Sequence, residues 1–210
     1  MNKESLIKKI VMAEWDMFQE VQNVGGKASC QEDFNTFEIT RACQFESWPD
    51  TALESYSDDI EKAKLKKRNL LTEKYARMME STSPKEFRKI KRRIPRLDPD
   101  VPELIDKILI ILLKCEKELM QKYPNVAIRG RAIYTSEDTP FTTSKETYFR
   151  GEMATYSVKT LGFYHDHISE LDANGKNISE IVLEETVKRY GYNSLTEANE
   201  ILKNQPVEGA

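Results

Sequence analysis

Two arginines of this sequence lie where a helix would place them among apolar residues. Arg41 belongs to a series at helical spacing, namely Phe34, Phe37, Glu38, Arg41, Phe45 and Trp48. Arg150 has a comparable setting near Tyr148 and Met153. An unpaired charge on such a face is costly. Because a guanidinium holds a carboxylate or phosphate with two parallel hydrogen bonds, Arg41 and Arg150 are candidate ligands for an anionic small molecule.

Internal ion pairs are the alternative interpretation of these two arginines. The carboxylates that would serve are Glu14 or Glu38 for Arg41, and Glu146 or Glu152 for Arg150. Structural ion pairs perturb charges as readily as binding sites do. Both interpretations stay open, and the sequence favours internal pairing.

Two glycine-bearing loops combine cations, hydroxyl groups and predicted helix starts. The first runs over 25–33 as Gly-Gly-Lys-Ala-Ser-Cys-Gln-Glu-Asp, and the second runs over 129–144. Backbone amides at a helix start attract anions. The loops therefore add candidate ligand-binding residues: Lys27, Cys30, Gln31 and Arg131. Neither loop matches the G-x-x-x-x-G-K-[ST] or G-x-G-x-x-G pattern, and ordinary loop and capping chemistry is the alternative.

Glu73 and Lys74 are further candidate site residues. They lie in the segment 69–79, where Lys74 and Tyr75 would suit proton transfer. The alternative is a core stripe beside a solvated ion pair between Glu73 and Arg77, which lie four positions apart.

The cysteines and histidines predict neither disulfides nor a metal site. The three cysteines, Cys30, Cys43 and Cys115, lack Cys-x-x-Cys spacing and indicate reduced thiols in a cytoplasmic protein. Cys30 at a helix start would favour a thiolate, but no histidine lies near it in sequence to act as its base. His165 and His167 would face different sides of a helix, so we expect no metal and no cofactor.

The composition suits a globular protein with long charged faces. The chain has 210 residues, of which 39% are hydrophobic and 32% charged, and its formal net charge is −3. This balance argues against a nucleic-acid partner, and the basic clusters at 62–68 and 85–96 are interpreted first as exposed helix faces. The longest apolar run, 108–113, is too short to span a membrane, so we expect no membrane association.

Apolar residues recur at steps of three and four, whereas strand-like alternation is nowhere sustained. Capping residues followed by an acid three positions later mark helix starts, and glycines and prolines mark the breaks. The sequence therefore predicts an all-α protein. The expected helices cover 3–22, 30–48, 51–67, 70–80, 84–93, 101–123, 144–171, 178–190 and 195–203.

The second half of the chain repeats features of the first. A displacement of 108 residues matches Leu53 with Leu161, Tyr56 with Tyr164, Asp58 with Asp166, Ile60 with Ile168 and Asn69 with Asn177. Nearer the start of each half the offset is 98 and then 104, as loop insertions would produce. We interpret the chain as two related helical units, 1–96 and 97–210. They are expected to pack as one compact, pseudo-twofold bundle with the main cleft near their interface.

Several motifs together are distinctive. They are Gly25-Gly26-Lys-Ala-Ser-Cys-Gln31, Asn69-Leu-Leu-Thr-Glu-Lys-Tyr-Ala-Arg-Met-Met79, Ser136-Glu-Asp-Thr-Pro, Thr143-Ser, Glu146-Thr-Tyr, Arg150-Gly-Glu152 and Thr155-Tyr-Ser157. With these motifs the chain resembles the uncharacterised-domain family 4125 of microbial proteins over nearly its whole length. The resemblance implies no established activity, catalytic residue or ligand.

Three classes of function stay open. The first is a binding or interaction module with an anionic small molecule near Arg41 and Arg150. The second is an enzyme that uses the polar loop residues, marked by a deep cleft gathering Cys30, Gln31, Glu73, Lys74 and Arg150. The third is a structural assembly protein with a broad apolar exposed face, and a homodimer is an option.

Overall fold

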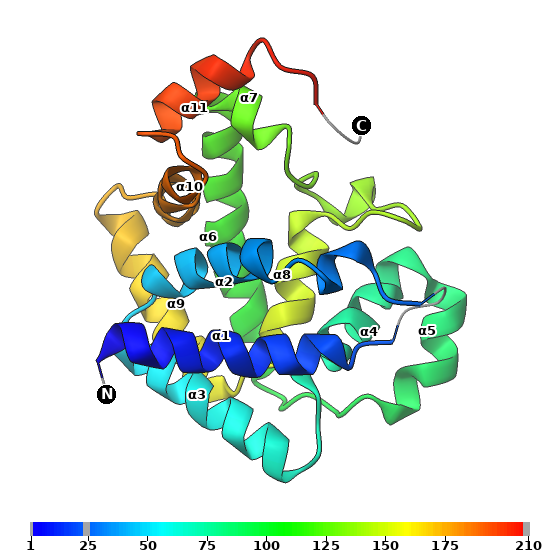
Figure 1. Cartoon of the computed structure of the whole chain (residues 1–210). Helices are drawn as coiled ribbons and strands as arrows, with labels where there is room; N and C mark the ends of the chain where they lie inside the picture. The colour runs from blue at the N-terminus through cyan, green and yellow to red at the C-terminus, as the bar shows by residue number, and fades with distance from the viewer. Residues whose placement is uncertain (1, 23–25, 208–210) are drawn as a thin grey trace.

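The computed structural model describes residues 2–22 and 26–207, and every regular element within them is helical (Figure 1). The prediction of an all-α fold is confirmed. The α-helices are α1 (Lys3–Gln19), α2 (Phe34–Glu46), α3 (Asp50–Leu65), α4 (Leu70–Thr82), α5 (Pro84–Ile90), α6 (Val101–Lys122), α7 (Pro124–Ala127), α8 (Lys145–Met153), α9 (Val158–Ala173), α10 (Ile178–Arg189) and α11 (Leu195–Leu202). None of these helices is long and apolar enough to cross a membrane.

Two helices organise the two halves of the molecule. α1 packs against α2, α3 and α4, and α6, which runs through the middle of the molecule, packs against α8, α9 and α10 (Figure 1). The halves also contact each other directly, because α2 packs on α10, α4 on α8 and α3 on α9. The main hydrophobic core therefore contains residues of both halves.

The turns that follow α3 and α9 repeat one another in detail. Asn69 caps α4 and donates to a backbone carbonyl of α1 at 2.7 Å. Asn177 caps α10 and donates to a backbone carbonyl of α6 at 2.9 Å. Two positions earlier, Lys67 and Gly175 have left-handed backbones with φ of 53° and 68°. These paired contacts support the duplication, and its twofold symmetry stays a prediction.

The single helix predicted over 144–171 is wrong, because the chain forms α8 and α9 with a break between them. Ser157 caps α9 by accepting a hydrogen bond from the amide of Thr160 at 3.3 Å. The amide of Ser157 in turn donates to Asp59 of α3 at 2.9 Å. The break contains neither glycine nor proline, and a contact with a distant helix stabilises it. The single turn of α7 was also not predicted.

Residues 94–100 connect the two halves between a short 3-10 turn, Lys91–Arg93, and α6. Arg77 of α4 holds this connection by donating from Nη2 to the carbonyl of Pro95 at 2.7 Å. The boundary expected between residues 96 and 97 lies in this segment, and the division into two units stays a prediction.

Candidate functional site

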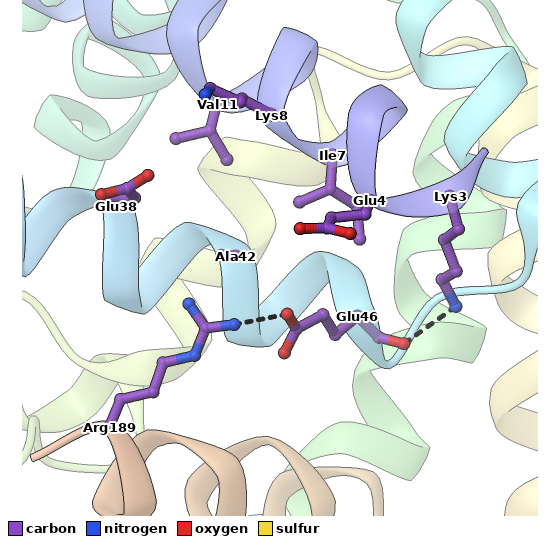
Figure 2. A pocket seen from close by; sticks show the side chains of 9 residues that line it. All are labelled: Lys3, Glu4, Ile7, Lys8, Val11, Glu38, Ala42, Glu46 and Arg189. Carbon is purple, nitrogen blue, oxygen red and sulfur yellow. Dashed lines mark hydrogen bonds and ion pairs between the residues drawn. The ribbon is translucent and has the colours of Figure 1, made fainter. Parts of the chain in front are cut away.

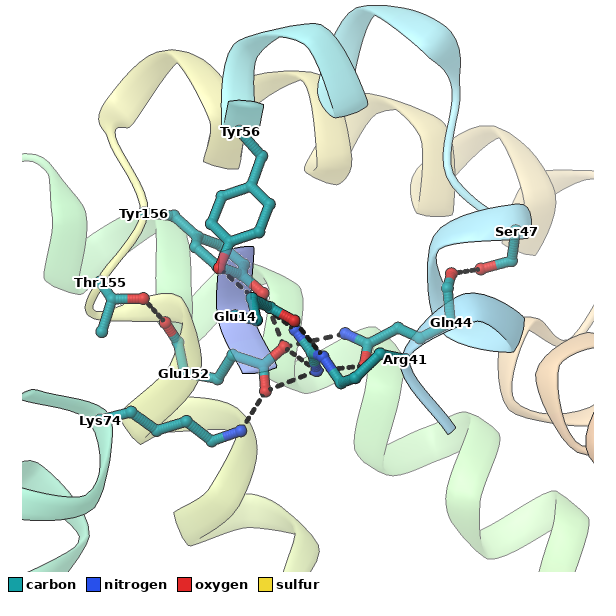
Figure 3. A network of polar contacts seen from close by, with 9 residues as sticks. All are labelled: Glu14, Arg41, Gln44, Ser47, Tyr56, Lys74, Glu152, Thr155 and Tyr156. Carbon is teal, nitrogen blue, oxygen red and sulfur yellow. Dashed lines mark hydrogen bonds and ion pairs between the residues drawn. The ribbon is translucent and has the colours of Figure 1, made fainter. Parts of the chain in front are cut away.

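The polar centre of the molecule is a network of buried charges that joins α1, α2 and α8 (Figure 3). Arg41 binds Glu14 through two parallel hydrogen bonds, from Nε to Oε2 at 2.6 Å and from Nη2 to Oε1 at 2.7 Å. Its Nη1 donates to Gln44 at 2.7 Å and to both carboxylate oxygens of Glu152 at 3.0 and 3.1 Å. Arg41 is only 4% exposed. The pair with Glu14, one of the internal partners considered above, is therefore present.

Lys74 of α4 and two tyrosines complete the network (Figure 3). The ammonium of Lys74 donates to Glu152 at 2.5 Å. The hydroxyl of Tyr56 donates to Glu14 at 2.6 Å, and that of Tyr156 donates to Glu152 at 2.6 Å. Two cations thus face two carboxylates. Such a buried set is costly to break, because removal of one member leaves its partner charged and unpaired.

Gly151 allows α8 to approach α4 closely enough for this contact. A Cβ atom at Gly151 would lie 2.8 Å from Cγ of Met78 and 3.1 Å from the carbonyl oxygen of Lys74. Both distances are shorter than ordinary van der Waals contact. The glycine therefore sets the spacing at which Lys74 reaches Glu152.

Five members of the network are held in their ordinary charge states. Burial favours a higher pKa for Glu152, but Arg41 and Lys74 outweigh burial and hold this pKa well below its usual range. Burial favours lower pKa values for the two cations, but the nearby carboxylates outweigh it and raise both. Burial also raises the pKa of Tyr56 and of Tyr156. None of these five groups is poised to exchange a proton near neutral pH.

A cleft of about 420 Å³ opens beside the network, between α2, α6, α8, α9 and α10. We call it the aromatic cleft, because five rings line it: Trp48, Tyr148, Phe149, Tyr156 and Tyr164. Gln44 and Glu152 also line it, so the network forms part of its wall. A cleft of this volume with apolar walls and few polar groups is typical of small-molecule sites. It lies between helices of both predicted units.

Two cations line the aromatic cleft and differ in their partners. Lys145 forms an ion pair with Glu116, which neutralises its charge. Arg131 is exposed and donates to the hydroxyl of Thr143 at 2.6 Å, and its Cζ lies 5.1 Å from the ring centroid of Tyr148. Arg131 forms no ion pair with any residue that the structure describes. Its charge is therefore available to a ligand.

The first glycine loop lies against the C-terminal end of α1, apart from the aromatic cleft. Gln31 is buried and donates to two backbone carbonyls at 2.7 and 3.0 Å. Lys27 donates to a glutamine side chain of α1 at 3.2 Å, and Cys30 is exposed. Gly25 lies outside the described residues. These contacts attach the loop to α1, which matches the ordinary loop chemistry considered above.

Glu73 and Arg150 take part in separate ion pairs. Glu73 accepts two hydrogen bonds from Arg68 at 2.7 and 2.6 Å, rather than pairing with Arg77. Arg150 is exposed and pairs with Asp106 at 2.7 Å. Arg41 and Arg150 therefore lie in different surroundings, and the loop residues do not join them.

Sequence reasoning missed several members of the site. Tyr56, Tyr156 and Gln44 were not predicted, because such side chains at helical spacing indicate core or surface positions as readily as a polar network. Glu152 was expected only as a partner for Arg150. Its distance of 111 residues from Arg41 left no local signal for their contact.

A second hollow, of about 490 Å³, lies between α1, α2 and α10 (Figure 2). Glu46 pairs there with Arg189, and Lys3 donates to the carbonyl of Glu46 at 2.9 Å. These charged groups already bind groups on neighbouring helices. The hollow is therefore a weaker candidate for a ligand site than the aromatic cleft.

The structure shows no metal-binding cluster within residues 2–22 and 26–207: no three His, Cys, Asp or Glu side chains are arranged to hold an ion. His167 instead lies 2.7 Å from the carbonyl of Ser47 through its Nε2 atom.

Comparison with known proteins gives a family and no activity. No curated protein and no solved structure matches the chain. A family model described as "Protein of unknown function (DUF4125)" matches residues 4–200, which include the network and the aromatic cleft. The resemblance inferred from the sequence motifs is thus confirmed, and the chain belongs to the DUF4125 family.

Proposed function

We propose that this protein binds a small organic molecule in the aromatic cleft, and that this molecule carries an anionic group on a planar, apolar body. The observation that carries the proposal is a ring-lined volume of about 420 Å³ with the unpaired guanidinium of Arg131 among its lining residues. The rings of Tyr148 and Phe149 suit a planar body. Arg131 suits a carboxylate or phosphate.

The charge network supports binding rather than acid–base catalysis. A general acid or base works best when its pKa lies near the operating pH. In the network the pKa of Glu152 is lowered, while those of Lys74 and the buried tyrosines are raised. Each shift moves the pKa of the group further from neutral pH. The network instead holds Gln44 and Glu152 in the wall of the aromatic cleft through hydrogen bonds with Arg41 and with each other.

The proposal includes a cytoplasmic location and a small-molecule partner rather than nucleic acid. The free thiols of Cys30, Cys43 and Cys115 support the location. The most exposed apolar side chains, Leu65, Ile110 and Phe141, belong to separate segments, so they do not favour a structural assembly face. A homodimer stays a prediction that sedimentation would test.

Calorimetric titration tests the proposal with aromatic anions and their neutral analogues. The probes are indole-3-acetate and 1-naphthyl phosphate, compared with indole-3-ethanol and 1-naphthol. We expect the anions to bind about tenfold more tightly than the neutral molecules, because only the anions engage Arg131. In the Arg131→Ala variant this preference should disappear.

Two further variants provide the controls. Val182→Trp places a large ring in the cleft and should abolish binding of all four probes. Arg88→Ala removes an exposed cation outside the cleft and should leave the affinities unchanged. Equal affinity in wild type and Val182→Trp, or no saturable binding at roughly millimolar probe, would contradict the proposal.

A further inference from the structure

A cavity of about 610 Å³ lies on another side of the molecule, between α3, α4, the connection 94–100 and the start of α9. Six cations line it: Lys62, Lys66, Arg68, Arg77, Arg96 and Lys159. We call it the cationic cavity. Its residues come from four segments that are distant in sequence, so the cluster is a product of the fold.

The carboxylates near the cationic cavity are already engaged. Asp59 accepts hydrogen bonds from the amide of Ser157 at 2.9 Å and from the hydroxyl of Thr160 at 2.6 Å. Asp98 accepts from a backbone amide at 3.1 Å. Glu73, behind the wall, pairs with Arg68. The lining thus holds six cations and two carboxylates, Asp59 and Asp98, so positive charge is in excess.

Four of the cations have no ionic partner of their own. Lys62, Lys66, Arg96 and Lys159 are exposed and form no ion pair with the described part of the chain. Like charges gathered in one concavity repel each other, and they raise the local concentration of anions. The arrangement therefore destabilises the empty cavity and favours an anionic occupant.

Arg77 provides a second, independent observation. Its Nη2 donates to Pro95, but its Nε is buried and has no hydrogen-bond partner among the described residues. Burial lowers the pKa of Arg77. A buried donor without an acceptor is uncommon and costs free energy. An anion in the cationic cavity would compensate this charge.

The start of α9 adds backbone donors to the same wall. Val158 and Lys159 line the cavity, and their amides have no acceptor among the residues described. α9 has 16 residues, and its aligned peptide dipoles place a partial positive charge at its N-terminus. The Asp59 carboxylate already accepts hydrogen bonds at this helix end, and the amides of Val158 and Lys159 remain for an oxyanion.

At a displacement of 108 residues Arg68 is related to the basic Lys176, whereas three other lining cations have no basic counterpart in the second unit. A displacement of 108 residues pairs Lys62 with Glu170, Lys66 with Asn174 and Arg77 with Glu185. Lys62 and Glu170 lie in α3 and α9, which both contain 16 residues. Positive charge at these positions is therefore not a requirement of the helical framework.

We propose that the cationic cavity is a second binding site, and that it takes a compact polyanion carrying two or more phosphate-type groups. A single phosphate brings at most about two negative charges, so a diphosphate matches the six lining cations better. The site is separate from the aromatic cleft and does not depend on the function proposed for it.

Calorimetric titration of the full chain with pyrophosphate tests this site. The variant Lys62→Ala/Lys66→Ala/Arg96→Ala should weaken binding at least about tenfold. The variant Lys85→Ala/Arg88→Ala/Arg92→Ala removes the same charge from exposed positions outside the cavity and should stay within about twofold of wild type. Inorganic phosphate should bind more weakly than pyrophosphate, and Arg131→Ala should bind pyrophosphate as wild type does.

Two measurements guard against a folding defect. Urea unfolding should show that both triple variants are folded, and the single variant Lys62→Glu, which introduces the residue type of position 170, should also weaken binding. In wild type, the NMR resonance of the Arg77 Nε–H group should shift on addition of pyrophosphate.

Three results would overturn the inference. The first is no saturable binding of pyrophosphate by wild type. The second is an equal loss of affinity in the two triple variants, which would indicate unspecific charge attraction. The third is tighter binding of a single-stranded oligonucleotide that the cavity variant abolishes, which would assign the surface to nucleic acid.

Discussion

Arg41 and Glu152 occupy matching positions in their helices and form a buried ion pair with each other. Each lies eight residues after the capping residue of its helix, Asp33 for α2 and Ser144 for α8. Nη1 of Arg41 lies 3.0 Å from Oε1 of Glu152. This contact between the two halves thus links opposite charges that lie at equal distances from their helix caps. Two arginines or two glutamates at these positions would repel each other, so the contact requires opposite charges.

Removal of one network charge should destabilise the fold strongly. We expect Glu152→Gln to lower the free energy of unfolding by about 3–5 kcal/mol, because Arg41 and Lys74 would stay buried with an incomplete set of partners. Urea unfolding at neutral pH measures the change. Arg150→Met removes an exposed pair and should cost no more than about 1 kcal/mol. Similar losses in the two variants would contradict the account of the network.

The pH dependence of stability should report the lowered pKa of Glu152. Its pKa is depressed in the folded state, so its stabilising contribution is present above the ordinary glutamate value of about 4.3 and is lost as pH falls toward the folded value. Urea midpoints measured from about pH 6 to pH 3 should therefore fall. The Glu152→Gln variant should show a shallower fall over the same range. Parallel curves would exclude Glu152 as a major contributor.

The left-handed residues after α3 and α9 should respond in opposite directions. Lys67→Gly should raise stability by about 0.5–1 kcal/mol, because glycine adopts φ near 53° without steric cost. Gly175→Ala should lower it by about 1 kcal/mol, because its φ is 68°. Thermal or urea unfolding of the two variants checks both signs. A loss at Lys67→Gly would show that its side chain has a role that the backbone does not explain.

Alanine substitutions at two helical glycines should change the stability of the protein in opposite directions. Gly151→Ala should destabilise the protein by about 1–3 kcal/mol, because the new methyl would meet Met78 and the Lys74 carbonyl. Gly162→Ala is the matched control, since nothing lies within 4 Å of the added Cβ. It should stabilise α9 by about 0.5–1 kcal/mol through helix propensity. Equal effects at the two positions would mean that α4 and α8 are not in close contact.

The helices could be predicted from the sequence because their apolar spacing and caps are local signals. Asn177 and Ser194, for example, cap α10 and α11, whose starts at 178 and 195 agree with the predicted ranges. The break before Ser157 could not be predicted, because its partner Asp59 lies 98 residues away. The helical spacing of Arg41 with its apolar neighbours identified it as a charge on an apolar face. Its contact with Glu152, however, depends on tertiary packing.

The residues of the aromatic cleft and of the cationic cavity were also only partly predictable from the sequence. The basic cluster at 62–68 was visible in the sequence and was interpreted as an exposed face. Only the fold brings Arg96 and Lys159 beside it. In the same way Arg131 was a candidate from its loop, whereas the rings that line the cleft with it come from α8, α9 and the segments that follow α2 and α8.

The packing of α2 on α10 and of α4 on α8 has a consequence for the connection at 94–100. Each half covers apolar surface that the other half cannot cover by itself. A chain divided within this connection should therefore yield fragments that complement each other when co-expressed, purify together as a heterodimer, and aggregate when either is produced alone. The covalent link would then serve to keep the halves at equal concentration, while their mutual burial maintains the fold.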